Sequence, residues 1–126
     1  MKLDHDCARD VLLLLEQTPF KGDQDVSFMD IINHSNILKY YQQESVLYAY
    51  AELVDGGFID GRQVQQIPID YAFVRITYKG HEFLDNIRND STWKKTKKTV
   101  SSKIGTASLS ILSSVAAKVI EHQLGL

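Results

Sequence analysis

The fold is decided by the segment Ile76-Thr-Tyr-Lys-Gly-His-Glu-Phe-Leu-Asp-Asn-Ile-Arg-Asn-Asp-Ser-Thr-Trp-Lys-Lys-Thr-Lys-Lys98 of this 126-residue chain. A short apolar strand ends at Ile76, and Thr77 stands at the N-cap position of a helix. That helix carries Phe83, Leu84 and Ile87 at helical spacing. The segment therefore predicts a strand that runs directly into a capped helix.

The preceding residues supply the other elements of a small α+β domain. Leu53-Val-Asp-Gly-Gly-Phe-Ile59 ends a helix at two glycines and starts a strand. In chain order we expect a helix from Asp4 to Gln17, a strand from Val26 to Ile32, a helix from Glu44 to Asp55, and hairpin arms from Gln63 to Ile69 and from Tyr71 to Ile76, with Pro68 at an edge or bend. Residues 33–43 stay open. This order is typical of a winged helix whose wing is a short hairpin.

Residues 91–126 are expected to form a basic linker and an appended amphipathic helix, after a winged-helix domain at residues 1–90. Ser91 is placed to cap a helical continuation near Trp93, and the stretch from Ser101 to Gly105 predicts a flexible joint. The last helix, Ala107 to Leu124, has a broad apolar face. We expect a dimer partner or the first helix to cover it. Its serines and its length argue against a membrane span.

Charge divides sharply along the chain. Residues 1–90 contain 8 Lys and Arg against 15 Asp and Glu, a net charge of −7. Residues 91–126 contain 6 against 1, a net charge of +5. An acidic winged helix has the wrong sign for binding duplex phosphates, so the asymmetry favours another kind of partner.

Enzymatic and metal chemistry find little support. The one cysteine, Cys7, excludes an internal disulfide and is expected to be a buried apolar residue. The four histidines fall on separate elements, which argues against a metal site, and the pair Asp23 and Asp25 lacks the other ligands of a calcium loop. No phosphate loop, nucleophile elbow or dinucleotide motif occurs. We expect no cofactor and no enzyme, and His81 with Asp85 only as a surface pair.

The helix from Glu44 to Asp55 occupies the position of a DNA-reading helix but contains no Lys or Arg. Tyrosines flank its acidic residues, and tyrosine is enriched in protein interfaces. Asp4 and Asp6 stand where the basic region of a signal peptide would be, which favours the cytoplasm of a bacterial host. The hypothesis is a surface that binds a host or phage protein, made of Tyr40, Tyr41, Glu44, Tyr48 and Glu52.

The alternative is a dimeric winged-helix transcriptional regulator that contacts DNA. Its phosphate contacts would come from the wing and from the lysine run after Trp93. The candidate residues are Arg62, Gln65, Lys94, Lys95, Lys97 and Lys98, with Gln66 also in the wing.

Several segments resemble one known family. They are Met1-Lys-Leu-Asp-His-Asp6, the stretch from Leu53 to Ile59, and the stretch from Ile76 to Arg88 with Trp93-Lys-Lys-Thr-Lys97. The chain resembles the domain-of-unknown-function family 2513, small phage- and prophage-encoded bacterial proteins similar to the YjcQ-type winged-helix proteins. The resemblance implies a fold and a mobile-element setting but no catalytic residues. With the charge pattern, it predicts a non-enzymatic accessory protein that modulates a host or defence protein.

Overall fold

The structure, a computed structural model, describes residues 1–22, 24–65 and 69–126. Contacts divide these residues between two units, Met1–His81 and Glu82–Leu126, and each unit is described by itself. The elements are α1 (His5–Glu16), β1 (Val26–Ser27), α2 (Phe28–Asn33), the 3₁₀ helix η1 (Ile37–Lys39), α3 (Gln43–Asp55), β2 (Ile59–Val64), β3 (Asp70–Ile76), α4 (Tyr78–Ile87), α5 (Asp90–Ile104) and α6 (Leu109–Gln123). The expected α+β class is confirmed, and the order up to β3 fits a winged helix. The expected boundary at residue 90 stays a prediction.

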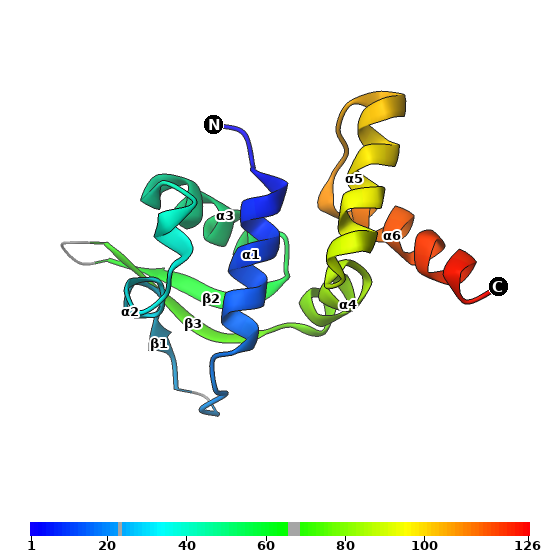
Figure 1. The fold of residues 1–126 in the computed structure, drawn as a ribbon. Coiled ribbons are helices and arrows are strands. Elements are labelled where there is room, and N and C mark those ends of the chain that lie inside the picture. The colour runs from blue at the N-terminus through cyan, green and yellow to red at the C-terminus, as the bar shows by residue number, and fades with distance from the viewer. Residues whose placement is uncertain (23, 66–68) are drawn as a thin grey trace. The chain divides into compact units, whose positions relative to one another are not determined.

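One antiparallel sheet has the strand order β1-β3-β2 (Figure 1). In the hairpin, Ile59 pairs with Ile76 and Val64 pairs with Asp70. The predicted first arm, residues 63–69, therefore starts too late, because pairing begins at Ile59, as soon as the chain leaves the turn at Gly57. Gln63 and Val64 lie in the arm as predicted, and residues 66–68 lie outside the described residues. A bulge between Asp60 and Gly61 shifts the register. The predicted bend at Pro68 lies outside the described residues.

The core of the first unit is centred on Tyr50 in α3. Its ring stacks on Phe28 with the centroids 4.1 Å apart, and its hydroxyl donates to the carbonyl of Ala72 in β3 at 2.7 Å. Burial, and then the charges of nearby carboxylates led by Asp70, raise the pKa of Tyr50 above its usual range. Tyr50 thus connects α2, through Phe28, and its own helix α3 to the central strand β3. α1 packs on α3 and on β3.

The segment from Val26 to Ile32 forms two residues of strand and then a helix, which corrects the predicted strand. The side chain of Ser27 accepts a hydrogen bond from the backbone N–H of Asp30 and so caps α2. Phe28 and Ile32, four residues apart, then share one buried face. The apolar residues at 26, 28 and 31–32 are compatible with a strand or with a helix. The N-cap hydrogen bond of Ser27 favours the helix.

Asp70, at the start of β3, stabilises the first turn of α2, although the two lie more than forty residues apart in the sequence. Its carboxylate accepts the hydroxyl of Ser27 and the backbone N–H groups of Met29, at 3.2 Å, and of Tyr71, at 2.6 Å. The carboxylate thereby satisfies an N–H group of the first turn of α2 while holding β1 against β3.

The two segments that decide the fold are joined to each other. The Thr77 hydroxyl donates to the carbonyl of Gly57 at 2.5 Å, and the Lys79 ammonium donates to the carbonyl of Gly56 at 2.9 Å. The backbone N–H of Thr77 donates to the carbonyl of Phe58. Thr77 also accepts from the N–H of Gly80 at 3.2 Å, which confirms it as the cap of α4. The end of α3 and the start of α4 are thus one hydrogen-bonded junction.

The C-terminal unit contains the end of α4 together with α5 and α6, which pack on each other. Asn89, not Ser91, caps α5, because the Asn89 side chain accepts from the N–H of Thr92 at 3.0 Å. The predicted joint at residues 101–105 is also wrong up to residue 104. Ser101 and Ser102 donate back to helix carbonyls instead of ending the helix, and the chain turns only at Gly105, whose φ is 83°.

The apolar face of α6 is covered in part within its own unit. Leu109, Leu112 and Ala116 are buried, whereas Ile111 and Leu124 remain exposed. Within the described residues no single helix is long and apolar enough to cross a membrane. α5 and α6 together have the required length and composition, but they are bent by 117° at the break between them. The predicted homodimer through α6 stays a prediction.

Candidate functional site

The outward side of α3 is acidic, as its sequence indicates. Val46, Ala49, Tyr50 and Leu53 are buried, so helical geometry places residues 44, 48, 52 and 55 on the opposite side. We call Glu44, Tyr48, Glu52 and Asp55 the acidic α3 face. Its three carboxylates are exposed, and among the described residues no hydrogen bond or ion pair engages their side chains. Tyr48 is half-buried beside them.

Tyr40 and Tyr41 lie in a different setting from the rest of the predicted binding surface. They line a hollow of about 520 Å³ between α1 and η1, together with Leu13 and Leu14. The side chain of Tyr40 is 77% exposed. The Tyr41 hydroxyl donates to Asp10 in α1 at 2.6 Å, and burial, this hydrogen bond and the charge of Asp10 raise its pKa above the usual range. Tyr41 is therefore a structural contact, while Tyr40 is free to meet a partner.

The arginines of the wing are engaged with carboxylates. Arg62 in β2 forms an ion pair with Asp25 at 3.0 Å, and Arg75 in β3 forms one with Asp60 at 3.6 Å. Gln65, at the end of the described part of the wing, is exposed, and Gln66 lies outside the described residues. A phosphate group that approached the wing would thus meet two arginines that are already paired with carboxylates.

A smaller hollow of about 230 Å³ lies between α3 and the wing. Ala51, Val54 and Asp55 line it from α3, and Arg62, Gln63 and Tyr71 line it from the strands. Asp55 belongs both to this hollow and to the acidic α3 face. The acidic α3 face therefore borders, at Asp55, a hollow that is large enough for one side chain of a partner.

The lysine run after Trp93 forms one side of α5. Lys94, Lys95 and Lys98 are exposed and lie within about 100° of one another around the helix. We call these three residues the basic α5 face. Lys97 lies on another side of the helix, with its ammonium 5.5 Å from the ring centre of Trp93. Trp93 itself is buried, which leaves the three lysines as the exposed cations of the run.

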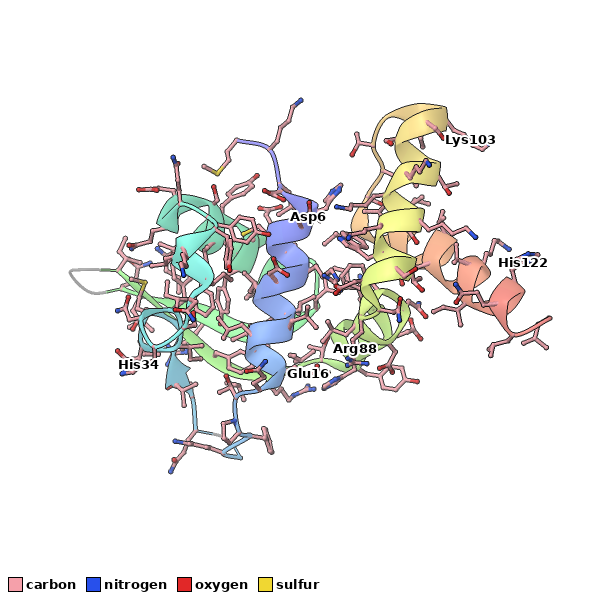
Figure 2. The ribbon with its side chains drawn as sticks, viewed as in Figure 1. Asp6, Glu16, His34, Arg88, Lys103 and His122 are labelled. Atoms are coloured by element: carbon pink, nitrogen blue, oxygen red, sulfur yellow. The ribbon has the colours of Figure 1, made fainter. Side chains whose placement is uncertain are left out.

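The other titratable groups in the described part of the chain do not form a metal-binding cluster. Figure 2 shows His34 at the end of α2 and His122 near the end of α6, and the described residues contain no group of three or more metal-ligating side chains. Asp85 pairs with Arg88 at 2.9 Å. Among the described residues no hydrogen bond or ion pair joins it to His81, so the predicted surface pair of His81 and Asp85 is wrong. An arginine guanidinium forms a stronger charge-assisted hydrogen bond with a carboxylate than a neutral donor does.

Cys7 is fully buried in α1, as predicted. Burial, followed by the charges of Asp4 and Asp10, raises the pKa of the thiol from 9.0 to about 12. Because only the thiolate reacts, we expect iodoacetamide to alkylate the native protein about a thousandfold more slowly than the urea-unfolded chain near pH 8.5. Mass spectrometry of quenched samples measures both rates. Equal rates would contradict the buried, protonated thiol.

Comparison with known proteins identifies the family to which most of the chain corresponds. Residues 2–107 match the family of hypothetical proteins DUF2513. The chain belongs to this family. An uncharacterized protein of Haemophilus influenzae is 33% identical over 85 residues, which cover 67% of the chain and 72% of that protein. No solved structure matches. The DUF2513 match ends before α6 begins at Leu109.

Several residues of the segments that resemble DUF2513 have structural roles. Gly56, Gly57 and Phe58 meet Thr77 and Lys79 in the hydrogen-bonded junction described above. These groups fix the end of α3 and the start of α4, and none of them belongs to the acidic α3 face. The segment Leu53–Ile59 also contains Asp55, so one residue of the acidic α3 face lies directly beside this junction. Sequence spacing had indicated Glu44 and Glu52, but it gave less weight to Asp55, whose hollow needs the folded wing.

Proposed function

We propose that this DUF2513 protein is a non-enzymatic accessory protein of the phage and prophage type that acts in the bacterial cytoplasm by binding a protein with a basic surface. The binding surface is the acidic α3 face, with the hollow beside Asp55. The observation that carries the proposal is the set of three exposed, unpaired carboxylates at Glu44, Glu52 and Asp55.

Electrostatics supports a basic protein over a nucleic acid at this face. Opposite charge across an interface speeds association and sets the register of the partners. A duplex would bring phosphates against three carboxylates, whereas DNA binding draws its affinity from cations that neutralise phosphates. The nearest wing cation, Arg62, is already paired with Asp25. A basic host protein, including one that itself binds nucleic acid, fits this surface.

The aromatic groups supply what charge alone does not. Exposed ion pairs contribute little to affinity, and tight interfaces depend on buried aromatic anchors. Tyr48 lies half-buried within the acidic α3 face, and Tyr40 is exposed at the rim of the α1 hollow. These two tyrosines are the anchors we propose, and the carboxylates orient the partner around them.

The test is capture from nuclease-treated bacterial lysate by the tagged wild-type protein and by an E52K/D55K variant. Both positions are exposed, and lysine is tolerated near the C-terminal end of a helix, so the variant should fold. We expect a basic protein that the wild type enriches at least about tenfold over the variant at about 50 mM salt, with the enrichment lost at about 500 mM.

The matched control is E82K/E121K, which makes the same change in net charge at two exposed residues outside α3. It should retain the captured protein. If the control loses the protein as well, binding depends on net charge and not on α3. If E52K/D55K captures everything that the wild type captures, the proposal is wrong.

A DNA-binding regulator is the second candidate, and the basic α5 face is the observation that favours it. Lys94, Lys95 and Lys98 are exposed cations without a carboxylate partner among the described residues. In that case a labelled duplex would bind at low salt and dissociate steeply as salt rises. Changing Lys94, Lys95, Lys97 and Lys98 to glutamine would abolish the binding. A duplex that stays unbound at about 50 mM salt removes this candidate.

A further inference from the structure

We propose that the acidic α3 face of one molecule binds the basic α5 face of a second copy of the same chain, so that the protein self-associates and covers its own binding surface. The occupant of the acidic face is thus the segment that carries Lys94, Lys95 and Lys98. The consequence for regulation rests on the proposed function, whereas the self-association itself does not.

The two faces have opposite charge and belong to units of opposite charge. Residues 1–81 contain 7 Lys and Arg against 12 Asp and Glu, a net charge of −5. Residues 82–126 contain 7 against 4, a net charge of +3, and the two add to the −2 of the chain. Each copy therefore carries one surface that attracts the other surface of its neighbour.

The charges on each face are unpaired and have matching spacing. Glu52 and Asp55 are three residues apart on α3, and Lys95 and Lys98 are three residues apart on α5. Because both segments are helical, each pair of residues is separated by a rise of about 4.5 Å along its helix. Two carboxylates can then meet two ammonium groups without any change in either helix. Lys94 extends the basic face by one more residue.

A contact between two different faces can either close on two copies or add further copies. Each contact joins one acidic face to one basic face, so two copies that exchange contacts reciprocally satisfy all four faces. Because exposed ion pairs are individually weak, the dissociation constant should be on the order of 100 µM at low salt. A foreign basic protein that binds through aromatic anchors as well would displace the second copy. Self-association would thus prevent weakly binding, non-specific basic proteins from occupying the acidic α3 face.

Sedimentation velocity at about 10 µM to about 1 mM protein, in about 50 mM and about 500 mM salt, tests the contact. The wild type should gain mass with concentration at low salt and remain monomeric at high salt. The variants E52K/D55K and K94E/K98E should each be monomeric, because each then carries two faces of the same sign. A 1:1 mixture of the two variants should associate again, since every reversed face finds an opposite one.

Control variants with the same change in net charge show whether association depends on the position of the charges or only on the net charge. E82K/E121K matches the first variant and K21E/K118E matches the second, all at exposed residues outside the two faces. Both controls should associate within about twofold of the wild type. A wild type that is monomeric at about 1 mM in low salt overturns the proposal. So does an association that neither reversal weakens, or a variant mixture that stays monomeric.

The K94E/K98E variant also separates this inference from the proposed function. It should lose self-association but still capture the basic protein from lysate, because its α3 face is unchanged. If it captures nothing while self-association follows the expected pattern, the proposed function fails and this inference stands. If it captures the protein and the wild type never self-associates, the reverse holds.

Discussion

Replacing Gly80 with alanine should destabilise the protein by about 3 kcal/mol or more, although alanine is the better helix former by about 1 kcal/mol. Gly80 lies in the first turn of α4, where the helix starts against the end of α3. A Cβ atom there would lie 2.2 Å from the carbonyl oxygen of Phe58 and 2.5 Å from Cγ2 of Ile76. The first contact is with backbone that is itself hydrogen-bonded to Thr77, so the clash cannot be relieved by a rotamer change. Urea unfolding followed by far-UV circular dichroism measures the loss.

Gly105→Ala is the matched control for this prediction. Gly105 has a φ of 83°, but a Cβ atom there would meet nothing within 4 Å. Its replacement should cost about 2 kcal/mol from backbone strain alone, because a ψ of −61° places Gly105 outside the left-handed helical region. If Gly80→Ala proved as stable as the wild type, or no worse than Gly105→Ala, the close approach of α4 to the turn after α3 would be wrong.

Replacing Asp70 with alanine should cost about 3 kcal/mol, because it removes the acceptor of three hydrogen bonds at once. The hydroxyl of Ser27 and the N–H groups of Met29 and Tyr71 all point at this carboxylate. The N–H of Met29 stands in the first turn of α2 and has no helical partner of its own. We expect the pairing of β1 with β3 and the start of α2 to weaken together. Hydrogen exchange at Met29 and Tyr71, measured with urea unfolding, reports both effects.

The Asp70→Asn variant separates the contribution of the hydrogen bonds to stability from that of the side chain's volume. The amide oxygen can still accept from Met29 and Tyr71, while the amide nitrogen cannot accept from Ser27. The expected cost is therefore about 1 kcal/mol. Asp30→Ala, at an exposed residue in the first turn of α2, should change stability by less than about 1 kcal/mol. Equal effects of Asp70→Ala and Asp30→Ala would contradict the bridging role of Asp70.

Much of the fold follows from local sequence, because the strongest signals lie within single elements. The spacing of Val46, Tyr50 and Leu53 identified α3, and the glycines after Asp55 identified its end. Thr77 was recognised as the cap of α4 from its position alone. The errors occurred where a short apolar run fits two structures. Residues 28–32 became helix because Ser27 and the distant Asp70 supply the hydrogen bonds of its first turn.

The candidate site divides in the same way. Sequence placed Glu44, Tyr48 and Glu52 on one side of a helix without any lysine or arginine, because helical period fixes which side chains share a face. It could not show that Tyr41 bonds to Asp10 in α1, since these residues are thirty-one positions apart. Nor could it show that Arg62 pairs with Asp25.

The sequence by itself determined that the chain has an acidic helix, a hairpin after two glycines, and a lysine run on a separate helix. Local capping and periodicity decide these features, and they need no partner elsewhere in the chain. Only the tertiary structure decided which charges remain available to a partner. Ion pairs and hydrogen bonds between distant residues engage Asp10, Asp25 and Asp70, whereas the carboxylates of Glu44, Glu52 and Asp55 have no partner among the residues that the structure describes.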